Sequence, residues 1–350
     1  MLAARTFLLA LLVAACTPAS TPVEVEPAKS EPTPVEPSAA PAVADVPIAT
    51  PTPAPIVAPE PTQPSVFASA SFPKNVHAAL VNTWSDHAWS VDIVDTQLVE
   101  GSALAKAIDE LAAAHEASPE AEDGYFEHAD LPAGHLAIPK GWKVGDTWTL
   151  LTRNGTLTRK AKGFSITIPA GSGTYHFDVK LGIAPKGEKG PAIAVRGSGM
   201  APTIAKPEAL PLATLGEGAL AKIRKAARGK AEPEQNETLR THPPKAKNVR
   251  VFAGRFPGGR THAIFVSIVD DELELTPFSA LLFARADGTI ERVKASDAIG
   301  EMRAWAIVDL DGDGLDEIVY EDEYHEGWYL DLLYWQHEQP KTRTLTGDGI

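Results

Sequence analysis

The prolines divide this chain into a part that cannot fold and a part that can. Of the 30 prolines in 350 residues, 14 lie between Thr17 and Val66. In that stretch proline alternates with Ala, Glu, Thr and Val, a composition that cannot bury enough apolar surface to offset the entropy of ordering the chain. Frequent proline also favours an extended spacer of about 3.1 Å per residue. We therefore expect residues 16–66 to be a disordered tether.

Residues 1–15 have the pattern of a secretory signal. Arg5 precedes an apolar run that is too short to stay in a membrane, and polar, proline-rich sequence follows at once. The last residues, Leu-Val-Ala-Ala-Cys at 12–16, resemble the lipobox of bacterial lipoproteins. The resemblance implies that Cys16 is lipidated and anchors the exported protein. An ordinary cleaved signal, with Cys16 incidental, is the alternative.

The residue after the cysteine bears on which membrane holds the anchor. Many lipoproteins that stay at the inner membrane carry aspartate there, whereas this chain has Thr17. By that analogy the anchor lies in the bacterial outer membrane, with the folded part on its periplasmic or surface face.

Charge and cysteine content exclude several classes of protein. The formal net charge of −14 argues against a general nucleic-acid binder, because neutralising phosphates supplies most of that affinity. One cysteine excludes a disulfide framework within the chain and any cysteine-based zinc site. Beyond the N-terminus, no stretch approaches the roughly 18 apolar residues that span a bilayer.

Residues 67–205 are expected to form a small β-rich barrel or sandwich with one helix near 102–115. Ser102 is a plausible N-cap for that helix, and Leu104, Ile108 and Leu111 fall at helical spacing. The clearest hairpin surrounds Asn154-Gly155, which predicts a type I′ turn with both residues at positive φ. Further short strands follow, separated by glycine-rich turns.

This region also holds the residues on which a catalytic alternative depends. No H-E-x-x-H, no histidine pair at helical i, i+4 spacing and no G-x-S-x-G occurs, so scattered surface or loop histidines are the favoured interpretation. The alternative is an envelope hydrolase with an unrecognised active site in 67–205, which requires these residues to converge in one cleft. They are His87, His115, His128 and His135, with Asp86, Asp123 and Asp130.

Residues 206–247 are expected to be a linker containing a basic helix at about 219–230. Such a helix can lie on a membrane or on nucleic acid. Its apolar face is short and lacks an aromatic residue, which favours a solvated linker helix. Pairing with the acidic C-terminal region of the same chain is a further interpretation.

Residues 248–350 are expected to form a β domain around one specific motif. Asp309, Asp311 and Asp313 stand at alternate positions and Gly314 follows, a spacing that lets carboxylates converge on one hard cation. Oxygen-only ligands of this kind suit Ca²⁺. An EF-hand is excluded because Tyr320 occupies the position of its bidentate glutamate and the flanks are strand-like. The alternative is a solvated acidic turn that binds nothing tightly.

The run Asp-Leu-Asp-Gly-Asp-Gly-Leu-Asp-Glu at 309–317 resembles the calcium loop of FG-GAP and VCBS repeats. Because one such loop is present and a propeller needs at least four blades, the resemblance implies a single repeat-like meander and not a full propeller. The family pattern implies side-chain ligands from Asp309, Asp311, Asp313 and Glu317 and a carbonyl ligand from Leu315. Asp316 could compete with Glu317.

Together these observations predict a mainly β protein with one or two helices, of the α+β class. They predict a membrane-anchored envelope lipoprotein that acts as a calcium-stabilised binding or interaction module. Its ligand is an unidentified protein or glycan, and not a nucleic acid. The alternatives are the hydrolase described above and a purely structural envelope scaffold.

Overall fold

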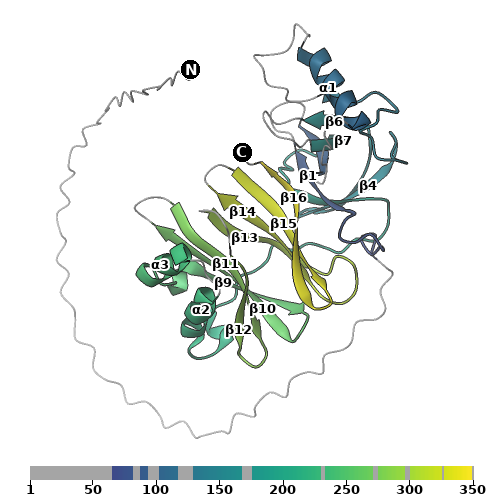
Figure 1. The fold of residues 1–350 in the computed structure, drawn as a ribbon. Coiled ribbons are helices and arrows are strands. Elements are labelled where there is room, and N and C mark those ends of the chain that lie inside the picture. Colours follow the sequence, from purple (N-terminus) through teal and green to yellow (C-terminus); the bar gives the residue numbers. More distant parts are fainter. Residues whose placement is uncertain are drawn as a thin grey trace, which may run out of the picture. The chain divides into compact units, whose positions relative to one another are not determined.

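The computed structural model describes residues 65–81, 87–93, 102–116, 129–167, 176–229, 233–270, 275–295, 300–324 and 327–348 (Figure 1). All of them belong to the compact unit Pro59–Ile350, one of two into which the chain divides. The predicted signal, Cys16 and the tether up to residue 64 lie outside the described residues. Within the described residues, no helix has the length and apolar character needed to cross a membrane.

The predicted fold class is confirmed. The protein is mainly β, and its strands form antiparallel sheets that include a half-barrel and do not make a full propeller. Among the described residues there are three sheets, and three α-helices accompany them. The second and third sheets both fall within the region expected to hold one meander, so this region contains two four-stranded meanders.

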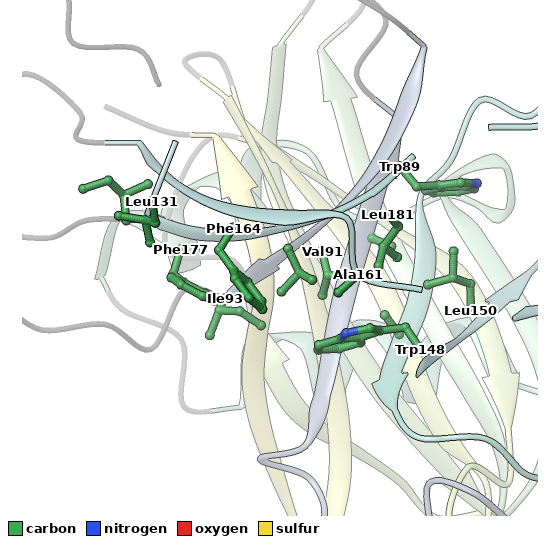
Figure 2. Packing of buried hydrophobic residues seen from close by; sticks show 14 of the residues in the cluster. Trp89, Val91, Ile93, Leu131, Trp148, Leu150, Ala161, Phe164, Phe177 and Leu181 are labelled. Carbon is green, nitrogen blue, oxygen red and sulfur yellow. The ribbon is translucent and has the colours of Figure 1, made fainter. Parts of the chain in front are cut away.

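The N-terminal sheet has eight strands in the order β3-β6-β7-β2-β1-β8-β4-β5. One face of it carries a cluster of buried aromatic and aliphatic side chains, among them Trp148, Phe164 and Phe177 (Figure 2). The strands are β1 (Val76–Val81), β2 (Ala88–Ile93), β3 (Ala129–Asp130), β4 (Thr147–Thr152), β5 (Gly155–Lys160), β6 (Gly163–Thr167), β7 (His176–Ile183) and β8 (Ala192–Arg196).

The predicted helix is α1 (Ala103–Glu116), and it packs on this face through Ile108, Leu104 and Leu111. Ser102 caps it, because its Oγ accepts a hydrogen bond from the Ala105 backbone N–H at 3.1 Å.

The hairpin of β4 and β5 is confirmed, but its predicted turn type is wrong. Thr152 pairs with Gly155, so Arg153 and Asn154 form the loop. Gly155 has φ +121°, while Asn154 is outside the left-handed region. The Thr152 hydroxyl accepts a hydrogen bond from the Asn154 N–H and donates one to the Gly155 carbonyl, both at 3.0 Å. This side chain fixes a turn that the Asn-Gly signal alone does not specify.

The second sheet, here called the helix-covered sheet, has the order β12-β11-β10-β9. One face packs against α2 and α3 through buried residues that include Ile223, Ala227 and Leu239 (Figure 1). The basic helix is therefore a packed layer of the fold, and not the solvated linker helix that its composition favoured. Its elements are β9 (Val249–Phe256), β10 (Arg260–Asp270), β11 (Leu275–Arg285) and β12 (Ile290–Ala295), with α2 (Ala219–Arg228), α3 (Pro233–Thr241), η1 (Leu212–Leu215) and η2 (Ala246–Asn248).

The third sheet, here called the central sheet, has the order β13-β14-β15-β16 and is buried on both faces. Val319 belongs to a core shared with the N-terminal sheet, whereas its neighbours Ile318 and Tyr320 belong to a core shared with the helix-covered sheet. Successive side chains of a strand point to opposite faces, which explains the alternation. The strands are β13 (Gly300–Val308), β14 (Glu317–Tyr324), β15 (Gly327–Gln336) and β16 (Gln339–Asp348).

Candidate metal site in the β13–β14 loop

The acidic motif forms the loop between β13 and β14. Val308 and Glu317 pair across the two strands, so residues 309–316 leave the sheet and return to it at one point. Gly312 has φ +81° and Gly314 has φ +89°, a backbone conformation that side chains disfavour. The glycines therefore allow a tight turn that folds the carboxylates back over the end of the strands.

Three of the predicted ligand residues are brought together by this turn. Asp309, Asp311 and Glu317 each offer a carboxylate oxygen, and these oxygens all lie within 4.8 Å of one another. The two aspartates are half-buried, whereas Glu317 is only 2% exposed. A buried carboxylate needs a compensating charge or hydrogen bonds, so this arrangement is suited to a cation.

Backbone N–H groups hold two of the carboxylates in place. Asp309 accepts hydrogen bonds from Gly312 N at 2.7 Å and from Gly314 N at 2.9 Å. Glu317 Oε2 accepts one from Leu310 N at 2.8 Å. Both side chains are therefore oriented by the loop itself.

The electrostatics of the loop favour neutralisation of the cluster. Burial raises the pKa of Glu317 to about 9, and repulsion from Asp311, Asp313 and Asp309 adds to the effect. The pKa of Asp311 is also raised, mainly by burial and then by the charge of Asp313. A divalent cation would remove this repulsion, and an all-oxygen donor set is the kind that Ca²⁺ prefers. Asp309, Asp311 and Glu317 fit such an ion and would hold it.

The structure places the other predicted residues differently. Asp313 lies outside the cluster of three, and its Oδ1 accepts a hydrogen bond from the Leu315 N–H at 2.8 Å. Asp316 faces β9, where its Oδ2 accepts from Arg255 N at 2.6 Å and its own N–H donates to the Arg255 carbonyl at 2.7 Å. Asp316 therefore fastens the loop to the helix-covered sheet and does not compete with Glu317.

Two further residues at this site have no signal in the local sequence. The Arg255 guanidinium lies 3.7 Å from Asp316 Oδ1 and 4.0 Å from Asp309 Oδ2, so it places a positive charge beside the cluster. Trp335 donates a hydrogen bond from Nε1 to the Asp316 carbonyl at 2.8 Å. Arg255 lies 61 residues before Asp316 and Trp335 lies 19 residues after it, so only knowledge of the sheet packing would have identified them.

A shallow hollow of about 280 Å³ lies beside the loop. Its lining combines apolar side chains with one charge of each sign from the segment before η1. The hollow is smaller than the roughly 300–1,000 Å³ of ordinary small-ligand pockets. The lining includes Phe252, Ile307, Pro207, Lys206, Glu208 and Asp316.

The histidines and aspartates of the hydrolase alternative are only partly described. Asp130 forms an ion pair with Lys180, and His135 Nδ1 accepts a hydrogen bond from Ala137 N at 3.1 Å. Among the described residues, the one group of three or more His, Cys, Asp or Glu side chains at metal-binding distance is Asp309, Asp311 and Glu317. Asp86, Asp123 and His128, and the side chain of His115, lie outside the described residues.

Comparison with known proteins adds no relative. No protein-family model matches the chain, and neither the curated proteins nor the solved structures give a significant match. The likeness of residues 309–317 to a calcium loop therefore stays a prediction carried by the loop itself.

Proposed function

We propose that this chain is a lipid-anchored envelope protein whose folded part is a binding module stabilised by Ca²⁺ in the β13–β14 loop. The observation that carries the proposal is the buried Glu317 carboxylate lying against the carboxylates of Asp309 and Asp311. When bound, the ion supplies positive charge to three acidic groups at the point where β13 meets β14. The loop orients Asp309 and Glu317 through the backbone N–H donors of Leu310, Gly312 and Gly314.

The site is placed so that an ion affects more than the loop. Asp316 and Trp335 connect the loop to β9 and β15, and the hollow beside it is lined in part by Asp316 and Ile307. An ion at the loop therefore stabilises one wall of this hollow. The role proposed is that of a binding module, and the ligand class proposed is a protein segment or a glycan.

Thermal unfolding with calcium and then with chelator tests the metal site. A ligand that binds only the native state adds about 2.7 kcal/mol at a hundred times its Kd, which raises Tm by several degrees in a protein of this size. We expect that shift in the unmodified chain and not in Asp309→Asn/Asp311→Asn. Glu323→Gln is the control, since it removes a carboxylate from the same hairpin that pairs with Arg303 instead. Equal melting with calcium and with chelator would contradict the proposal.

The anchor is tested separately. Metabolic labelling with a radioactive fatty acid should mark the unmodified chain and leave Cys16→Ser unlabelled. After a high-salt wash the variant should move from the membrane to the soluble fraction. A labelled Cys16→Ser chain, or an unlabelled parent chain, would contradict lipidation at this residue.

A further inference from the structure

The exposed side of α2 is a basic surface on an acidic protein. Residues 219–250 contain nine Lys or Arg against three Glu, whereas the whole chain has 32 basic residues against 46 acidic ones. Helix α2 itself has no acidic residue. Ala219, Ile223 and Ala227 face the sheet, so the charged side chains occupy the other side of the helix.

The basic surface continues from α2 onto the turn before β9. Arg224 donates a hydrogen bond from Nε to the Pro244 carbonyl at 2.8 Å, which places α2 against the residue that precedes Lys245. We call these residues the basic surface; its exposed members are Lys222, Lys225, Arg228 and Lys245, with Arg224 half-buried.

Three of these side chains bond to neutral groups, which do not cancel their charge. Lys222, Arg224 and Arg228 bond to the carbonyl oxygens of Gly288, Pro244 and Leu239, which are neutral. The apolar side of α2 is already used against the helix-covered sheet, so this helix cannot insert into a bilayer. The exposed side of α2 is left to interact through its charge, and a partner that matches it is a broad anionic surface.

We infer that the basic surface docks on anionic phospholipid headgroups. Clusters of four to eight Lys or Arg on an amphipathic helix bind anionic bilayers, and each basic residue near the surface strengthens binding about fivefold. The acidic loop at 309–317 belongs to the central sheet, which packs on the opposite face of the helix-covered sheet from α2. Docking through α2 would point the acidic loop, which anionic headgroups repel, away from the bilayer.

Vesicle co-sedimentation of residues 17–350 tests the inference, because that chain lacks the signal and Cys16. We expect binding to phosphatidylglycerol vesicles at low salt, loss of binding at high salt, and no binding to phosphatidylcholine vesicles. Lys225→Glu/Lys245→Glu should lower the partition coefficient at least tenfold while leaving Tm unchanged. Lys186→Glu/Lys189→Glu makes the same charge change at exposed residues of the β7–β8 connection and should bind like the parent chain.

Three outcomes would overturn the inference. One is no binding to phosphatidylglycerol vesicles, and another is an equal loss in both double variants, which would reflect net charge alone. The third is binding that appears only when the six tether acids are replaced by amides, which would make the tether the occupant of the basic surface. The acids are Glu24, Glu26, Glu31, Glu36, Asp45 and Glu60.

Discussion

Glu317 is the residue on which the metal site depends most, because it is buried and its neighbours share its charge. Without a cation, the folded state raises its pKa from 4.5 to about 9, chiefly through burial. A carboxyl group with a raised pKa binds protons more tightly in the folded than in the unfolded state. The fold is therefore destabilised as the pH rises from 4.5 towards 9.

Glu317→Gln should have opposite effects with and without calcium. In chelator at pH 7.5 we expect the variant to be at least about 1 kcal/mol more stable than the parent, because a buried ionisable group is replaced by a neutral one that can still accept from Leu310 N. In calcium the variant should be no more stable than the parent. Denaturant unfolding in both conditions measures this, with Glu323→Gln as the control. If the variant were less stable than the parent in chelator, the Glu317 carboxylate would not be destabilising the fold.

The lowered pKa of His77 predicts how the free energy of unfolding depends on pH below neutrality. This side chain on β1 is 7% exposed, and its ring contacts those of Trp148 and Trp142 edge-on. Burial, with a smaller contribution from the charge of Arg343, lowers its pKa from 6.5 to about 3. The unfolded state then binds the proton first. Stability is fully present above pH 6.5 and is lost as the pH falls from 6.5 towards 3.

His77→Gln should remove that part of the pH dependence. Between pH 6 and 4 we expect the parent to lose up to about 1.4 kcal/mol per pH unit more than the variant. Urea unfolding at a series of pH values gives the two slopes, and His242→Gln, which removes an exposed imidazole, controls for loss of a histidine. Parallel slopes for the parent and His77→Gln would contradict the assignment.

At the scale of helices and strands, the sequence predicted the features that depend on residues close together in the chain. Helix α1 follows from Ser102 and the spacing of Leu104, Ile108 and Leu111, all within a few turns. The acidic loop and its strand flanks were also predictable, since alternate aspartates and a glycine suffice to suggest a turn that gathers carboxylates. The fold class followed from many such local signals.

Contacts between distant segments were not predictable in this way. The role of Asp316 depends on Arg255, 61 residues away. Nothing in the sequence near residue 316 shows whether this aspartate bonds the loop to β9 or binds a metal ion. The Asn154-Gly155 turn was misjudged because the Thr152 hydroxyl, not the Asn-Gly pair, fixes the loop. The short apolar face of α2 favoured a linker helix because the sheet that covers it is formed by strands later in the chain.

Ile223→Ala distinguishes a packed α2 from a solvated one. Ile223 is fully buried in the core of the helix-covered sheet, so truncation should lower the free energy of unfolding by about 2–4 kcal/mol. Ala221→Ser, on the exposed side of the same helix, should stay within about 0.5 kcal/mol of the parent. Chemical denaturation monitored by circular dichroism gives both values, and similar small effects would mean that α2 is a solvated appendage.

At the scale of the whole folded unit, the central sheet joins the other two sheets into one structure. On one side Thr346 of β16 donates to Asp92 of β2, and Arg343 donates to the Pro73 carbonyl. On the other side Lys294 of β12 contacts Tyr320 and Asp331, each at 2.8 Å. The acidic loop extends from this central layer, so stabilising it should be felt in both cores.

Variants of two neighbouring leucines of β15 test whether both faces of the central sheet contribute to the free energy of unfolding. Leu332 belongs to the core shared with the N-terminal sheet and Leu333 to the core shared with the helix-covered sheet, and both are fully buried. We expect Leu332→Ala and Leu333→Ala each to cost about 2–5 kcal/mol and to lower one common transition seen by fluorescence and by circular dichroism. Thr158→Ala, on the exposed face of edge strand β5, should cost less than about 0.5 kcal/mol. If one leucine variant were nearly neutral, or if the two probes separated, the sheets would fold as independent units and an ion at the loop would stabilise only its own hairpin.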